Sequence, residues 1–123
     1  MAEKSERTNA EREVFEAHAN VMRVLSNPVR HEIFHRIVEA PSTVTSLVAA
    51  TGASKAAVSQ HVSALRACGI VRAERAGRSV MFTAAYPELA EACALIDRVL
   101  TDQASRTTRL IKGTDASQSE GME

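Results

Sequence analysis

The segment from Ser54 to Arg66 concentrates side chains that can donate or accept hydrogen bonds on a partner. At the helical period of 3.6 residues these side chains fall on one face of a helix. The face presents Lys55, Ser59, Gln60, Ser63 and Arg66. It can recognise a partner by hydrogen bonds and positive charge, and it offers no broad apolar surface for docking.

No arrangement of residues indicates catalysis. The chain lacks a glycine-rich phosphate loop and a nucleophile elbow, and neither cysteine has both a histidine and an acid at suggestive positions. The sequence therefore predicts a binding protein rather than an enzyme.

An aliphatic stripe on the opposite side of the segment sets its orientation. Val58, Val62 and Leu65 are spaced i, i+4 and i+7, which predicts a helix that buries this side in a core. Ser54 can cap the first turn, and Gly69 suits the left-handed residue that ends a helix. We expect one anchoring side and one exposed polar side.

A short helix precedes this one. Thr43 can cap it, Leu47 and Val48 belong to its apolar face, and Gly52 closes it two residues before Ser54. Two helices joined by a tight turn form a helix-turn-helix, whose second helix lies in the major groove of DNA. The segment therefore favours a DNA-recognition helix.

After Gly69 the pattern changes from a helical period to a period of two. The alternation in residues 71–75 and 80–84, with a glycine-containing tip between them, predicts a β-hairpin. Arg75 and Arg78 lie at the tip, where arginines beside a recognition helix can meet phosphates or enter a minor groove. A hairpin in this position is a wing.

Amphipathic helices are expected on both sides of this unit. Apolar residues recur at three and four between Asn9 and Leu25, a second helix runs from Pro28 to Glu39, and Pro87 opens the last one. The last helix carries an apolar seam over two heptads, which we interpret as a dimerisation surface paired with the first helix. The alternative is that it covers its own domain. The predicted interface residues are Val14, Val21, Leu89, Ala92, Cys93, Ile96, Val99 and Leu100.

Length and composition predict one domain with a modest aliphatic core in a chain of 123 residues. We expect it at residues 9–111, between disordered tails at residues 1–8 and 112–123 that have little to bury. The fold class is mainly α with a small β-hairpin, a winged helix-turn-helix of about five helices and a two-stranded wing. No apolar run approaches the roughly 20 residues that span a bilayer, and no signal peptide is evident, so we expect a cytoplasmic protein without a membrane partner.

The charge is distributed unevenly along the chain. The formal net charge is +0, yet residues 54–83 hold five Lys and Arg against Glu74 alone. Local positive charge of this kind is typical of a nucleic-acid interface, although a few arginines can also simply solvate a loop.

Cysteines and histidines offer candidates for a sensor. Cys93 on the expected seam is an ordinary packing residue or a thiol sensor, acting alone, with its symmetry mate or with Cys68. His31 and His35 are spaced i, i+4 and could place two imidazoles on one metal, but no third ligand is evident. We interpret them as solvent-facing or core-edge histidines and expect no metal cofactor, with metal binding as the alternative.

Four motifs carry a resemblance to a known family. They are Leu25–Arg30, Ser54 with Ala57–Val62 and Leu65, Gly69–Val71, and Arg75–Arg78. In combination they resemble the ArsR/SmtB winged helix-turn-helix repressors, over about Val21 to Tyr86. The resemblance implies a homodimer, formed by the first and last helices, that represses its operator and releases it when an inducer binds.

The resemblance also implies positions for the DNA contacts. The major-groove positions of the family fall on Ser54, Lys55, Ser59, Gln60, His61 and Ser63, joined by Arg66, and the wing positions on Arg75 and Arg78. The amide of Gln60 can pair with adenine through two hydrogen bonds. His61 has an alternative interpretation as a half-buried helix histidine, since it follows Val58 by three residues and precedes Leu65 by four.

The metal-ligand positions of the family are not filled by good ligands. A Cys-x-Cys pair on the third helix is replaced by Thr43-Val44-Thr45, and hydroxyls bind soft or borderline metals poorly. A second family site uses Asp and His on the last helix, where this chain has Asp97 and Asp102 but no histidine.

The function predicted on these grounds is a dimeric, sequence-specific regulator of double-stranded DNA, a repressor of the ArsR type with no assigned inducer. One alternative is a winged-helix module that binds protein, but the outward face has only Ala56 and Ala64 as apolar residues. The other is a thiol-based redox-sensing repressor that uses Cys93 and Cys68.

Overall fold

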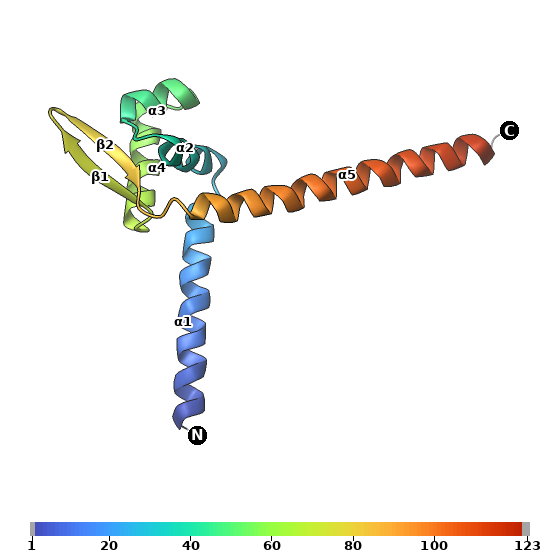
Figure 1. The fold of residues 1–123 in the computed structure, drawn as a ribbon, viewed down its shortest axis with the longest axis horizontal. Coiled ribbons are helices and arrows are strands. Elements are labelled where there is room, and N and C mark those ends of the chain that lie inside the picture. The colour runs from blue at the N-terminus through green and yellow to red at the C-terminus, as the bar shows by residue number, and fades with distance from the viewer. Residues whose placement is uncertain (1, 122–123) are drawn as a thin grey trace. The chain divides into compact units, whose positions relative to one another are not determined.

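The computed structural model describes the backbone of residues 2–121 and the side chains of residues 8–113. Its elements are α1 (Ala2–Val24), α2 (Pro28–Glu39), α3 (Val44–Thr51), α4 (Lys55–Ala67), β1 (Val71–Ala76), β2 (Ser79–Ala84) and α5 (Leu89–Gly121) (Figure 1). The chain divides into two units, residues 1–87 and 88–123. The predicted fold class, five helices with a two-stranded wing, is confirmed.

Side-chain caps set the starts of α2, α3 and α4. Asn27 accepts from a backbone N–H in the first turn of α2 at 3.0 Å. Thr43 and Ser46 form a capping box at the start of α3, each side chain accepting from the other's backbone N–H. The hydroxyl of Ser54 accepts from the N–H of Ala57 at 3.1 Å. Each cap satisfies an N–H that the helix itself leaves without a partner, and the predicted starts are confirmed.

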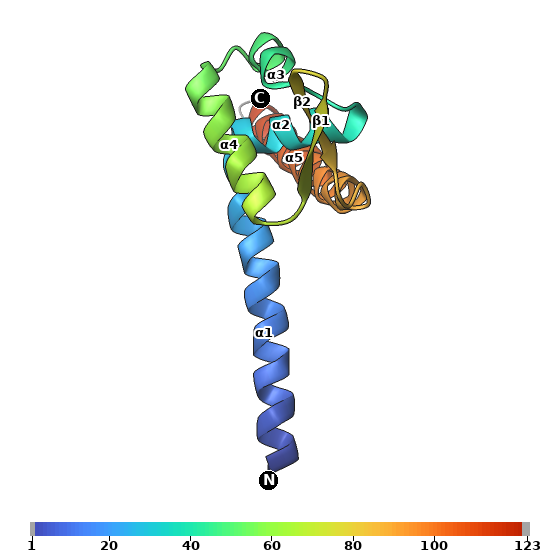
Figure 2. The same cartoon turned by 90° about the vertical axis from the view of Figure 1, so that its left-hand side faces the viewer.

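The core forms where α2, α3 and α4 pack together, with β1 beside α4 (Figures 1 and 2). The predicted stripe on α4 is buried, because Val58, Val62 and Leu65 are each 0–2% exposed. The other fully buried side chains of this core are Ile33, Phe34, Ile37 and Leu47. Burial of the stripe anchors α4 through one side only.

The hairpin has a tight tip. β1 and β2 are antiparallel, and the pair Ala76 and Ser79 closes a loop of two residues, Gly77 and Arg78. Gly77 has φ +66°, a left-handed conformation that glycine adopts without steric cost. Alternation predicted a four-residue tip, residues 76–79, but Ala76 and Ser79 pair as the last rung of the strands, so the tip has two residues.

A short backbone pairing that the sequence did not indicate fastens the hairpin to the helices. Ser42, between α2 and α3, donates its N–H to the carbonyl of Phe82 at 3.0 Å and accepts from the N–H of Phe82 at 2.8 Å. The side chain of Phe82 is buried in the core. The position of the wing is thus set by backbone bonds and by packing together.

The end helices extend into the segments for which disordered tails were predicted. α1 begins at Ala2 and α5 continues to Gly121, so the helices include residues 2–8 and 112–121, and the disorder of these segments stays a prediction. A helix that is already nucleated gains one backbone hydrogen bond for each added residue, and it needs no buried face to extend. Residues 1, 122 and 123 lie outside the described residues. Within the described part of the chain, no helix combines the length and the apolar character needed to cross a bilayer.

Apolar residues of α1 and α5 remain exposed in the single chain. On α1, the buried face predicted from the helical period is not covered, since Val14, Phe15 and Met22 are 55%, 71% and 67% exposed. On α5, a second apolar set is 56–60% exposed, consisting of Leu95, Ile96, Val99 and Leu100. Each helix therefore presents apolar surface to solvent in the isolated chain.

The cap at Ser54 yields a stability prediction. Replacing Ser54 with Ala removes the acceptor for the N–H of Ala57 and should lower the free energy of unfolding by about 0.5–2 kcal/mol. Urea unfolding followed by circular dichroism measures the change. Ser63→Ala, at an exposed position inside the same helix, is the control and should leave the midpoint nearly unchanged. Equal midpoints for Ser54→Ala and the wild type would contradict the role of the cap.

Candidate nucleic-acid interface

The outward side of α4 is polar and accessible. Among the side chains of α4 and its cap that were predicted to contact a ligand, His61 is half-buried and the others are exposed. The exposed ones are Ser54, Lys55, Ser59, Gln60, Ser63 and Arg66. None of them is needed to fill the core, because the buried stripe lies on the other side. The structure therefore brings together on one accessible face the residues that the sequence grouped by period.

His61 is held by a neighbouring helix. It is half-buried, and its Nδ1 accepts a hydrogen bond from Nε of Arg30 on α2 at 3.4 Å. Burial, and then the charge of Arg30, lower the pKa of His61, which favours the neutral acceptor form. Arg30 also donates to the carbonyl of Val24, the last residue of α1, at 3.2 Å. The geometry favours the packing interpretation of His61, and a DNA contact from its other ring nitrogen stays a prediction.

Arg30 is the residue of this site that sequence reasoning missed. The sequence analysis named Arg30 only as the last residue of a family motif. The apolar pattern of α2 does not indicate that Arg30 contacts a residue of α4. Cross-helix contacts of this kind depend on how two helices pack, which residue spacing alone does not determine.

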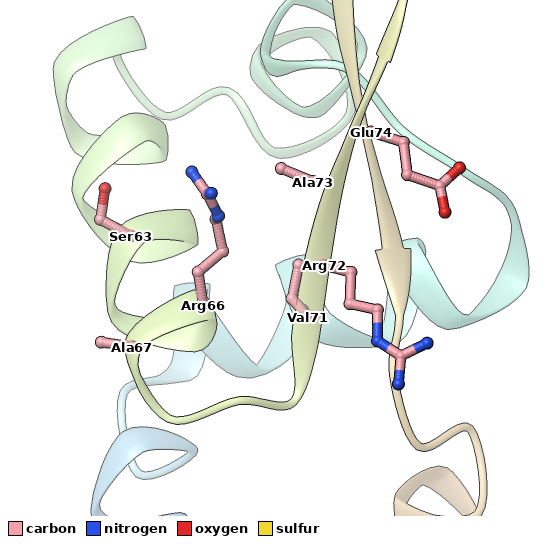
Figure 3. A pocket seen from close by; sticks show the side chains of 7 residues that line it. All are labelled: Ser63, Arg66, Ala67, Val71, Arg72, Ala73 and Glu74. Atoms are coloured by element: carbon pink, nitrogen blue, oxygen red, sulfur yellow. The ribbon is translucent and has the colours of Figure 1, made fainter.

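An open groove lies between α4 and β1. Ser63, Arg66 and Ala67 line one side, and residues 71–74 line the other. Figure 3 shows Arg66 extending from α4 into the space in front of β1, with Val71 turned toward α4. Arg72 and Glu74 point away from α4, as the alternation of a strand requires. Arg66 therefore places a positive charge between α4 and β1.

The wing arginines continue the positive surface. Arg75 and Arg78 are both exposed, the first on β1 and the second in the turn. By strand alternation Arg75 lies on the same face of β1 as Val71 and Ala73, the face toward α4. Arg75 thus adds positive charge on the side of the hairpin that faces α4.

The cations of this surface are available to an external anion. Among the side chains at positions 8–113, the salt bridges are Arg36–Glu32 and Arg106–Asp102, both outside α4 and the hairpin. Lys55 and the arginines of the surface accordingly have no acidic partner within 4.0 Å in that part of the chain. When such cations neutralise DNA phosphates, they release the counterions condensed on the DNA, which is a large source of affinity.

The pKa shifts of the two thiols are opposite to those of activated cysteines. Cys68 is half-buried and Cys93 is buried, and both are free. Burial raises the pKa of each thiol, and the carboxylate of Asp97 raises that of Cys93 further. A redox-sensing thiol needs a lowered pKa, because the thiolate is the reactive species. The thiol-sensor alternative therefore gains no support.

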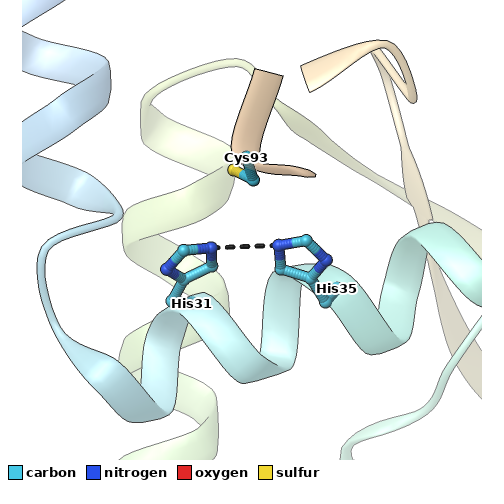
Figure 4. Close-up of side chains that lie close together, drawn as sticks. All are labelled: His31, His35 and Cys93. Atoms are coloured by element: carbon cyan, nitrogen blue, oxygen red, sulfur yellow. Dashed lines mark hydrogen bonds between the residues drawn. The ribbon is translucent and has the colours of Figure 1, made fainter. Parts of the chain in front are cut away.

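Two places bear on metal binding. The hydroxyl of Thr43, at the family's ligand position on α3, already serves as a helix cap. On α2, the Nε2 atoms of His31 and His35 lie 2.9 Å apart, so that the spacing seen in the sequence brings the two nitrogens together (Figure 4). Both rings are half-buried.

The predicted dimer residues fall into two groups by exposure. Val21 and Leu89 are half-buried and Cys93 is buried. The others are exposed apolar residues, namely Val14, Ala92, Ile96, Val99 and Leu100.

Comparison with known proteins agrees with this arrangement. The family described as bacterial regulatory protein, arsR family, matches residues 27–73. The chain is 38% identical over 79 residues to the HTH-type transcriptional repressor SmtB of Mycobacterium tuberculosis, a match over 64% of this chain. It spans only 58% of the length of that relative. It is also 33% identical over 99 residues to the HTH-type transcriptional regulator CmtR of the same organism, which covers 77% of this chain and 84% of that protein.

A solved structure shares the fold. It is the homodimeric winged helix-turn-helix DNA-binding domain of Mb0332 from Mycobacterium bovis, with a TM-score of 0.69 and 24% sequence identity, covering 78% of this chain and 89% of that one. The family match and the sequence relatives confirm the predicted resemblance. The chain belongs to the ArsR/SmtB family of winged helix-turn-helix transcriptional regulators, which are DNA-binding proteins rather than enzymes.

Proposed function

We propose that this chain is a dimeric repressor that binds a specific double-stranded operator through α4 and the hairpin. The observation that carries the proposal is the polar face of α4, which a fully buried stripe on the other side holds outward. It is flanked by arginines that have no acidic partner among the side chains of residues 8–113. A helix of this kind enters the major groove, while basic side chains beside it neutralise phosphates. Gln60 and the serines of the same face then read base edges.

The repressor role rests on the relatives. SmtB is named a transcriptional repressor, and this chain is 38% identical to it over 79 residues. A regulator that occupies operator DNA prevents transcription by its presence, and nothing further in this chain would be required. We place this activity in the cytoplasm, where its DNA target lies.

The dimer rests on exposed apolar surface and on the homologous fold. Large aliphatic residues such as Ile96, Val99 and Leu100 are more than half exposed in the single chain, which is unfavourable in water unless a partner covers them. The homologous domain from Mycobacterium bovis is homodimeric. A two-fold axis would present two copies of α4 to half-sites about 34–36 Å apart.

The protein-binding alternative receives little support from the exposed face of α4. Ala56 is exposed and Ala64 is half-buried, so the face offers very little apolar surface to a protein partner.

The inducer stays unassigned, since the family's metal positions on α3 and α5 carry no suitable ligand set.

The wing arginines yield a prediction about salt dependence. The double variant Arg75→Ala, Arg78→Ala should weaken binding to operator and unrelated duplexes alike, because phosphate contacts carry no sequence information. The slope of log affinity against log salt should flatten by about 1 for each lost contact. Fluorescence anisotropy across a salt series measures it, with Arg109→Ala on α5 as the control. An unchanged slope in the double variant would exclude the wing from the interface.

A different outcome is expected for Gln60. Gln60→Ala should reduce discrimination at one base pair of each half-site by about 1–3 kcal/mol, since an amide recognises adenine through two bonds. Affinities for a set of single-base-pair variants of the operator measure this, and the wing double variant, which should lose affinity evenly, is the comparison. A uniform loss across all positions in Gln60→Ala would show that this amide does not read a base.

The dimer surface can be tested on α5. Ile96→Glu places a charge within the apolar set and should yield a monomer with much weaker affinity for a two-half-site operator. Ser105→Glu adds the same charge on the opposite side of the helix, by the 3.6-residue period, and should remain dimeric. Sedimentation velocity of both variants gives the result. A dimeric Ile96→Glu variant would remove this face from the interface.

A further inference from the structure

We propose that His31 and His35 on α2 form a binding site for one divalent transition-metal ion. The two Nε2 atoms face each other at 2.9 Å, and the ring centroids are 4.8 Å apart at 32° between planes (Figure 4). The site differs in position from the family's metal-ligand positions on α3 and α5 discussed above. It is independent of the function proposed above.

The separation of the nitrogens suits an ion between them. With metal–nitrogen bonds of 2.0–2.1 Å, two ligands at a right angle lie about 2.9 Å apart, and two tetrahedral ligands about 3.3 Å apart. The observed 2.9 Å matches the first geometry and lies within a small side-chain rotation of the second. Imidazole is a good ligand for zinc, copper and nickel, and paired histidines at i and i+4 on a helix are a known two-ligand arrangement.

The rings are already positioned without a metal. At 2.9 Å one Nε2–H donates to the other Nε2, so a single proton occupies the space that an ion would take. When the ion binds, that proton moves to Nδ1 of its own ring, and both rings stay neutral with a lone pair on Nε2. An edge contact with Phe34, whose side chain is fully buried, restrains the ring of His35. Little side-chain entropy remains to be lost on binding.

Imidazoles supply two ligands, and solvent or further side chains complete the coordination shell. Two histidines on one helix therefore define the minimum site, and the probe should be an ion that prefers nitrogen ligands. Ni²⁺ is suitable because its cis ligands lie at right angles in tetragonal or octahedral sites.

Calorimetric titration of the metal-free, DNA-free full chain with NiCl₂ tests the proposal. We expect one saturable site per chain, with at least a tenfold loss of affinity in His31→Ala and again in His35→Ala. His18→Ala, at an exposed histidine of α1, is the matched control and should bind like the wild type. Equal affinity in both α2 variants, or no saturable binding, would overturn the proposal. Because no DNA is present, the result leaves the operator proposal untouched.

A second measurement covers the case in which a histidine variant fails to fold. NMR of ¹⁵N-labelled wild-type protein, titrated with diamagnetic Zn²⁺, should shift the Nε2 resonances of His31 and His35 together. The resonances of His18 and His61 should stay in place. Shifts confined to other histidines, or an ion held by the thiols with the α2 rings unaffected, would contradict the site.

Discussion

The burial of the aliphatic stripe on α4 is the interaction on which the rest of the structure depends. Val58, Val62 and Leu65 fill the space between α2, α3 and β1, and together they leave almost no apolar area on that side exposed. Because the three side chains occupy one side of a regular helix, their burial determines which residues of α4 face solvent. The polar surface is thus a consequence of core packing, and none of its exposed side chains fills the core.

Much of this arrangement could be predicted from local patterns. The starts of α2, α3 and α4 follow from Asn27, Thr43 and Ser54, whose side chains act within one turn of their own position. The hairpin follows from alternation, and its tip from Gly77. Such features depend on neighbours in the chain, which a single sequence displays.

Features that depend on packing between distant segments could not be predicted in the same way. The pairing of Ser42 with Phe82 and the bond from Arg30 to His61 each join residues that are far apart in sequence. The pair His31 and His35 was visible as a spacing, but its ring geometry required the structure. Disorder of the tails was predicted from their low apolar content, whereas α1 and α5 run through residues 2–8 and 112–121.

Arg30 has a mechanical consequence for how such a protein would hold DNA. Its guanidinium group donates hydrogen bonds to the final carbonyl of α1 and to the imidazole of His61, so it links α1 to α4, the helix that we propose contacts DNA. These two hydrogen bonds couple the tilt of α1 to the tilt of α4. If α1 contributes to a two-fold dimer contact, this single side chain couples two orientations. One is the angle between the two subunits, and the other is the angle at which α4 enters the major groove.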